Sequence, residues 1–188
     1  MVLVQKPFRY IRHGLTDWNA DKLCVGQVDV PLSEAGISQA RAAASIVQKL
    51  NVTTVFHSPL KRARDTALLL SSGMSWRLVS EDGLKEVCLG IKEGQPEGNP
   101  RDDFVASWLA GYSIDEAEGF CDFRQRIVDT LNKCLAEIST TPPLIVAHSG
   151  VFMALASACG IRNYEIAHCM PCIFLPSPGG WVIEHAVD

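Results

Sequence analysis

The sequence predicts one α/β domain over residues 1–188, a three-layer α/β/α sandwich around a mainly parallel central sheet. Three observations predict it. The length of 188 residues is typical of one domain. Strand-like and helix-like segments alternate along the chain, and short loops join them without an internal repeat or an interdomain linker. With 47% hydrophobic and 20% charged residues, the composition excludes a mainly disordered chain.

The first half of the chain contains two strand–helix units. The apolar segment 8–11 predicts a strand, and Ser33 is a plausible N-cap for a helix that continues to Leu50, because apolar residues recur there at helical spacing. The β-branched segment 53–57 predicts the second strand. Segment 58–70 begins with Ser-Pro, which predicts a serine cap and a proline in the first turn of a helix.

The second half is less regular at its start and then alternates again. The expected elements are a strand at 77–79, a loop at 90–100, helices at 101–110 and 119–138, a buried strand at 143–147, a helix at 151–159 that is apolar on every side, and a hairpin of 172–175 with 181–185.

Charge and apolar patterning exclude several classes of partner. Seventeen basic and twenty-one acidic residues give a net charge of -4, so no global positive field attracts nucleic acid or an anionic membrane. The longest apolar stretch, 144–161, contains His148 and Ser149, which favours a buried strand and helix over a membrane span. The first residues do not resemble a signal peptide. With an odd number of cysteines, seven, this predicts reduced thiols and a cytoplasmic location.

Polar residues follow three of the predicted strands. The pairs are Arg12-His13, His57-Ser58 and His148-Ser149. Ligands of open α/β sheets bind outside the carboxyl ends of the strands, so these residues stand where a site is expected.

The helix after the second strand begins with an unusual concentration of positive charge. Lys61, Arg62 and Arg64 lie in its first turns, where the helix dipole disfavours cations. One direction on a helix faces a given pocket, so we expect one of the three to meet an anion and the others to be solvated.

Five segments, in order, resemble the histidine phosphatase superfamily, which includes cofactor-dependent phosphoglycerate mutases and small phosphomonoesterases. The segments are Arg12 to Asn19, Gly26 to Gly36, Ser58 to Ala67, Leu84 to Glu86 with Gly90, and Val146 to Gly150. The resemblance covers nearly the whole chain and implies the phosphoglycerate mutase-like fold.

The resemblance also implies roles for individual residues. It implies His13 as the nucleophile, Glu86 as the proton donor, Arg12, Arg62 and His148 as phosphate ligands, and Asn19 and Gly26 in the loop of the phosphate pocket. Ser149 stands where glycine is common, and its backbone N–H remains available as a substrate-binding donor.

The chemistry of phosphoryl transfer agrees with these residue types. The transferred group spreads negative charge over its oxygens, and guanidinium groups meet that charge with fixed, paired donors. His13 must attack as a neutral imidazole, and two nearby arginines lower the pKa of a histidine. We therefore expect the nucleophile to be available at neutral pH.

Two other groups compete for a role. Glu93 lies in a Lys-Glu-Gly segment that also resembles a family segment, but the Leu-x-Glu context favours Glu86 as the donor. His168, Cys169 and Cys172 resemble half a metal or redox site, yet no second pair of ligands has matching spacing. We expect reduced thiols, no metal and no cofactor.

The sequence thus predicts a metal-independent phosphomonoester hydrolase that acts through a phosphohistidine on a small phosphorylated metabolite. Residues 116–120 with Arg124 resemble a segment of small phosphatases, including those that act on α-ribazole phosphate. A phosphoglycerate mutase is the first alternative, although the segment after Glu86 lacks the basic insertion of that branch. A non-catalytic phosphate-binding module is the second. We expect a monomer or a homodimer.

Overall fold

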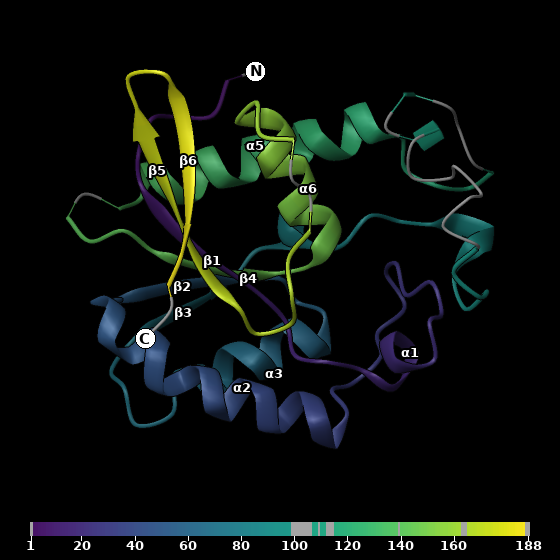
Figure 1. The fold of residues 1–188 in the computed structure, drawn as a ribbon, viewed down its shortest axis with the longest axis horizontal. Helices are drawn as coiled ribbons and strands as arrows, with labels where there is room; N and C mark the ends of the chain where they lie inside the picture. Colours follow the sequence, from purple (N-terminus) through teal and green to yellow (C-terminus); the bar gives the residue numbers. More distant parts are fainter. Residues whose placement is uncertain are drawn as a thin grey trace.

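A six-stranded sheet forms the centre of the protein in the computed structural model, which describes residues 2–98, 107–108, 110–111, 115–138, 140–162 and 165–186. The strands are β1 (Phe8–Arg12), β2 (Thr54–His57), β3 (Arg77–Ser80), β4 (Leu144–Ala147), β5 (Pro171–Ser177) and β6 (Gly180–His185). Their order across the sheet is β3-β2-β4-β1-β5-β6 (Figure 1). The first four strands are parallel to one another, and β5 pairs antiparallel with both β1 and β6. The predicted mainly parallel sheet is confirmed.

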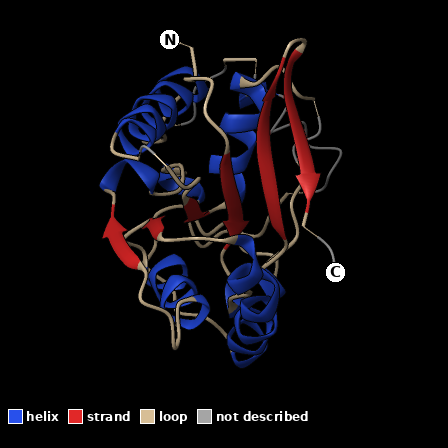
Figure 2. Ribbon diagram, turned by 90° about the vertical axis from the view of Figure 1, so that its left-hand side faces the viewer, coloured by secondary structure: helices blue, strands red, loops and turns tan. Residues whose placement is uncertain are grey.

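Helices cover both faces of this sheet. They are α1 (Asp17–Ala20), α2 (Glu34–Val47), α3 (Lys61–Leu70), α5 (Phe120–Ala136) and α6 (Ser149–Ala158). Helices α2 and α3 lie on one face, and α5 and α6 lie on the other (Figures 1 and 2). The three-layer α/β/α prediction is therefore confirmed.

Successive side chains of each strand point to opposite faces of the sheet and pack into two hydrophobic cores, one on each face. On β4, Ile145 packs into the core under α5 and α6, and its neighbour Val146 packs into the core over α2 and α3. On β2, Phe56 packs into the first of these cores and its neighbour Val55 into the second. Successive strand side chains point to opposite faces, so a sheet buried on both sides needs continuous apolar runs.

Helix α2 begins where the sequence predicts. The Ser33 side chain accepts a hydrogen bond from the Gly36 N–H, which satisfies one of the free donors of the first turn. The helix ends at Val47, and the expected last turn is a 3-10 helix at Gln48–Leu50.

The cap predicted for α3 is wrong. The N-cap residue is Leu60, which makes no side-chain cap bond, and the helix begins at Lys61, two residues after Pro59. The Ser58 hydroxyl instead lies 2.8 Å from Nε2 of His148. Extended backbone at Leu60 (ψ 134°) keeps Ser58 outside the helix, and its side chain contacts His148, the residue that follows β4.

The remaining elements lie close to the predicted positions. Strand β4, helix α6 and the β5–β6 hairpin are confirmed, and α5 begins after Gly119 as expected. The loop expected at 90–100 contains a short 3-10 helix, Gly90–Lys92. Most of the helix expected at 101–110 lies outside the described residues.

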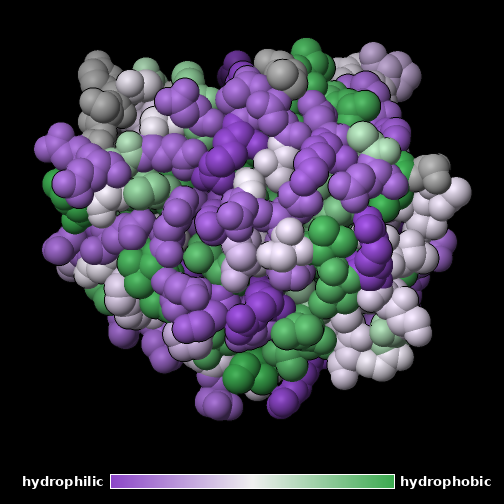
Figure 3. Space-filling model, turned by 180° about the vertical axis from the view of Figure 1, so that it is seen from behind, coloured by the Kyte–Doolittle hydropathy of each residue, from purple (hydrophilic) through white to green (hydrophobic). Residues whose placement is uncertain are grey.

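Hydrophilic side chains cover much of the face opposite to the view of Figure 1, with smaller hydrophobic areas between them (Figure 3). Among the helices that the structure describes, none has the length and apolarity needed to cross a bilayer.

Candidate active site

Three neighbouring parallel strands end at the same edge of the sheet and bring His13, Ser58 and His148 together. The N–H of His13 donates to the carbonyl of Ala147, and the N–H of Ser58 donates to the carbonyl of Val146. These bonds continue the β1–β4 and β2–β4 ladders by one residue. The polar residues that follow the strands therefore meet, as the topology predicts.

A hydrogen bond within the described residues determines which ring nitrogen of His13 carries the hydrogen. The side chain is 3% exposed, and Nδ1 lies 2.7 Å from the carbonyl oxygen of Gly14. A carbonyl oxygen only accepts, so Nδ1 carries the hydrogen. The lone pair of the neutral ring is then on Nε2, which is the nitrogen available for nucleophilic attack.

Arg62 is held rigidly in the interior. It is 1% exposed, with Nη1 donating to the Val28 carbonyl at 2.8 Å and Nη2 to the Gly26 carbonyl at 2.7 Å. Burial lowers the pKa of Arg62 to about 10, so the guanidinium is charged at neutral pH. Its helix neighbours Lys61 and Arg64 are exposed, as expected.

The loop that holds Arg62 is itself fixed by Glu93. Gly26 has a φ of +53°, and its Cβ position would collide with the Glu93 carboxylate. Oε1 of Glu93 accepts from the N–H groups of Gln27 and Leu89. Glu93 thus ties two loops together, and the residue expected in the pocket loop, Gly26, orients Arg62 through its carbonyl.

Arg12 and His148 complete the group around His13. Nη1 of Arg12 donates to the Ile166 carbonyl at 3.1 Å. The ring centroid of His148 lies 5.1 Å from that of His13. The hydroxyl of Tyr10 donates to the carbonyl of His148 and fixes its backbone.

Three buried nitrogen atoms of this group have no hydrogen-bond partner among the described residues: Nε of Arg12, Nε of Arg62 and Nδ1 of His148. Buried polar groups are almost always paired, because an unpaired one costs about 1–3 kcal/mol. Guanidinium nitrogens can only donate. A cluster of free donors with two positive charges is suited to an anion.

The same surroundings keep both histidines neutral. Burial lowers the pKa of His13 well below its ordinary value, and the charges of Arg62 and Arg12 lower it further. Burial also lowers the pKa of His148, with Arg62 again the largest charge acting on it. The sequence predicts the arginine effect, and the structure adds burial as the larger cause.

Glu86 joins the site from the segment after the 3-10 helix Asp82–Leu84. Its Oε1 accepts from its neighbour Val87 at 3.0 Å, and its Oε2 accepts from the N–H of Gly150 at 3.0 Å. The hydroxyl of Ser149 lies 3.5 Å from the same Oε2. Ser149 and Gly150 are the first residues of α6, so the carboxylate of Glu86 lies at the N-terminus of this helix.

Arg126 was not identified from the sequence. Its Nη1 donates to the carbonyls of Gly83 and Lys85, its Nη2 lies 3.4 Å from the carbonyl of Glu86, and its guanidinium pairs with both oxygens of Glu118. In the sequence, Arg124 is the basic residue that joins this acidic segment in its resemblance to small phosphatases. The residue that pairs with Glu118 lies two positions later on α5, a difference that spacing alone does not resolve.

The sequence singles out His168 only as part of half a metal or redox site and does not predict its contact with His13. Its Nδ1 donates to the carbonyl of His13 at 2.8 Å, and the two ring centroids are 5.3 Å apart. Burial, with the charge of Arg12, lowers the pKa of His168 to about 4. His168 precedes β5, an antiparallel strand, so the rule on the carboxyl ends of parallel strands gives no signal for it.

The other predicted residues have local roles. Oδ1 of Asn19 accepts from the Thr16 hydroxyl at the start of α1. Cys169 and Cys172 are buried free thiols, and the described residues contain no group of three His, Cys, Asp or Glu side chains placed to hold a metal ion.

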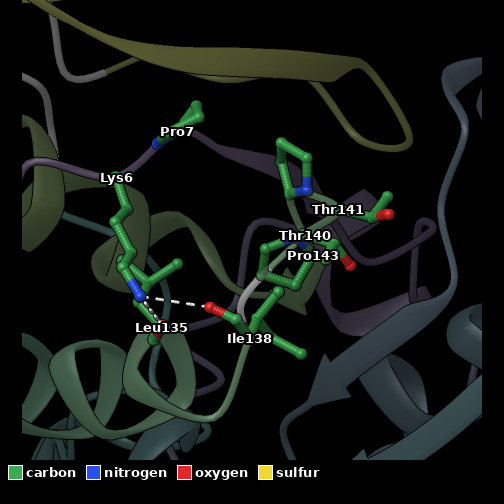
Figure 4. A pocket seen from close by; sticks show the side chains of 8 residues that line it. Lys6, Pro7, Leu135, Ile138, Thr140, Thr141 and Pro143 are labelled. Carbon is green, nitrogen blue, oxygen red and sulfur yellow. Dashed lines mark hydrogen bonds between the residues drawn. The ribbon is translucent and has the colours of Figure 1, made fainter.

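A pocket at the opposite end of the strands is separate from this site. It is lined by Lys6, Pro7, Leu135, Ile138 and residues 140–143, which precede β1 and β4 or end α5 (Figure 4). The Lys6 ammonium donates to the carbonyls of Leu135 and Ile138 and so completes the end of α5.

Known proteins resemble this chain over nearly its whole length. The model of the histidine phosphatase superfamily (branch 1) matches residues 10–188. The chain is 30% identical to a probable phosphoglycerate mutase of Yersinia pestis strain Pestoides F, over 95% of this chain and 91% of that protein.

Solved structures share the fold. A mycobacterial glucosyl-3-phosphoglycerate phosphatase in complex with VO3 superposes with a TM-score of 0.83 at 23% identity, covering 97% of this chain and 98% of the other. A putative alpha-ribazole-5'-P phosphatase from Escherichia coli superposes with a TM-score of 0.78 at 22% identity, covering 97% and 96%.

Proposed function

The chain belongs to the histidine phosphatase superfamily, and on this premise we propose that it is a phosphomonoesterase that forms a phosphohistidine on His13. One observation carries the proposal. The three unpaired buried nitrogens belong to Arg12, Arg62 and His148, around a His13 ring whose Nε2 lone pair is free. An anionic group bound there meets donors and a nucleophile together.

In the first step, Nε2 of His13 attacks the phosphorus of the bound monoester. The bond between phosphorus and the ester oxygen breaks, and Glu86, which enters this step as the neutral acid, gives its proton to the departing alkoxide and becomes a carboxylate. The guanidinium groups of Arg12 and Arg62 hold the phosphoryl oxygens, on which the charge of the transition state is concentrated. An alcohol leaves, and the phosphoryl group stays on His13.

In the second step, water attacks the phosphohistidine. Glu86, now a carboxylate, takes a proton from the water, and the bond between phosphorus and Nε2 breaks. Inorganic phosphate and neutral His13 result, and Glu86 has its proton back. The Gly14 carbonyl holds Nδ1–H throughout, so the attacking nitrogen is the same in every cycle.

This mechanism uses no metal ion. Two guanidinium groups supply the positive charge that a metal would otherwise supply to the phosphoryl oxygens. We propose that activity persists in the presence of a chelator.

We propose a small phosphorylated metabolite as the substrate. Glucosyl-3-phosphoglycerate and α-ribazole phosphate, named for two proteins of the same fold, are the first compounds to test. The second candidate function is phosphoglycerate mutase activity, which the 30% identical relative favours. A mutase transfers the phosphoryl group back to a carboxylated substrate instead of to water.

The test measures phosphate release from an aryl phosphate and from a phosphometabolite panel, beside a coupled mutase assay with 3-phosphoglycerate, each with and without chelator. We expect phosphate release, unaffected by chelator, that His13→Ala abolishes and the exposed control His185→Ala retains. Mutase turnover without phosphate release would establish the alternative. Phosphate binding without turnover would establish a non-catalytic module.

A further inference from the structure

The Ser58 hydroxyl is fully buried between two groups that determine where its hydrogen points. The N–H of Leu60 donates to Oγ of Ser58 at 3.3 Å, and Nε2 of His148 lies 2.8 Å from the same oxygen. Leu60 can only donate, and no other acceptor contacts this hydroxyl among the described residues. A hydrogen bond from this hydroxyl to Nε2 of His148 pairs the buried hydrogen, whereas the opposite direction would leave that hydrogen without an acceptor among the described residues.

An acceptor at Nε2 fixes the tautomer of a neutral imidazole. If Nε2 receives a hydrogen bond, the ring hydrogen is on Nδ1. Nδ1 is the buried atom of His148 that has no partner among the described residues, and it belongs to the ring beside His13. His148 then has an N–H at its unpartnered ring nitrogen, in a ring whose centroid is 5.1 Å from that of His13.

We propose that Ser58 is a positioning residue that holds neutral His148 in its Nδ1–H tautomer, so that the ring donates to the transferred phosphoryl group without carrying a positive charge. The opposite tautomer would turn a lone pair toward the phosphoryl oxygens. In a site that already contains the charges of Arg12 and Arg62, neutral His148 then supplies a hydrogen-bond donor without adding a third cation. The inference rests on the phosphatase activity proposed above.

The tautomer is read directly in the resting protein by two-bond proton–nitrogen NMR correlations of the imidazole rings at neutral pH, with the His148 signals assigned by their loss in His148→Ala. We expect a protonated Nδ1 and an unprotonated Nε2 in the wild type. Nε2–H in the wild type would overturn the inference. This readout does not depend on turnover, so it separates failure of the inference from failure of the proposed function.

A double-mutant cycle then tests the consequence for catalysis. Removal of one donor to a transition-state oxyanion costs about 10²–10³-fold in kcat, so we expect Ser58→Ala to lower kcat by about 10²-fold. In a His148→Ala background the same change is expected to have little further effect. A full and independent loss in that background would contradict the inference.

The matched control is Ser71→Ala, another buried serine, whose hydroxyl donates to the carbonyl of Ala67 on α3. We expect it to keep wild-type kcat. Circular dichroism spectra and urea midpoints of all variants report whether each is folded.

Discussion

The carboxylate of Glu86 accepts a hydrogen bond from the N–H of Gly150, so the segment after β3 is joined to the first turn of α6. A Cβ at residue 150 would collide with the Glu86 carboxylate. A side chain at residue 150 would therefore displace the Glu86 carboxylate from its bond to the Gly150 N–H.

Gly150→Ala is therefore expected to displace Glu86 and lower kcat by about 10²-fold, the usual contribution of a positioned general acid. The measurement is the rate of phosphate release from an alkyl phosphate and from an aryl phosphate. The loss of kcat should be smaller with the aryl phosphate, because its good leaving group depends less on a proton donor. Gly179→Ala is the control, because nothing lies within 4 Å of its Cβ position. Unchanged kcat on alkyl phosphates in Gly150→Ala would argue against Glu86 as the donor.

Arg126→Gln is expected to lower kcat by about 10²-fold with a smaller change in KM, since a shift of about 1 Å in a catalytic group has that cost. Arg126 holds the carbonyls of Gly83 and Lys85 and the Glu118 carboxylate, so its loss releases the segment that carries Glu86. Arg124→Gln, on the same helix, is the control. Equal kinetics of the two variants would contradict a positioning role.

His168→Ala is expected to lower the free energy of unfolding by about 1–3 kcal/mol, because the buried carbonyl of His13 loses its donor. His168→Asn keeps a side-chain N–H and should recover much of the loss. Urea denaturation compares the three proteins. If both variants lose the same stability, the hydrogen bond to His13 is not what His168 contributes.

Stability should fall as the pH falls below about 6.5, the ordinary pKa of histidine. The pKa values of His13 and His148 are lowered in the fold, so the unfolded chain binds protons that the folded protein does not. Each such proton contributes a slope of about 1.4 kcal/mol per pH unit. Urea denaturation at pH 7.5, 6.5 and 5.5 measures the slope, which His13→Gln should reduce by one proton. Stability independent of pH over this range would contradict neutral, buried histidines.

The strand ends show why the sequence predicts much of this site. Apolar runs such as Leu144–Ala147 mark buried parallel strands, and parallel strands deliver the residues that follow them to one edge. That rule predicts that the residues after these strands, His13 and His148 among them, stand at the edge of the sheet where a site is expected. The family resemblance adds Glu86, which comes from a loop that periodicity does not describe.

What the sequence could not predict depends on tertiary hydrogen bonds. Ser58 is followed by proline and resembles a helix cap, yet its strongest partner is His148, ninety positions away. Arg126 and His168 donate hydrogen bonds to backbone carbonyls. Every residue type has such a carbonyl, so these bonds leave no pattern in the sequence. The contribution of burial to the histidine pKa values likewise follows only from the packed structure.

The central claim is a covalent phosphoryl group on Nε2 of His13, and rapid acid-free quenching during turnover of an aryl phosphate, followed by intact-protein and fragment mass spectrometry, tests it most directly. We expect one added phosphoryl group, located on His13, in the wild type and none in His13→Gln. Steady turnover by His13→Gln, or a wild-type phosphoryl group on any other residue, would contradict it.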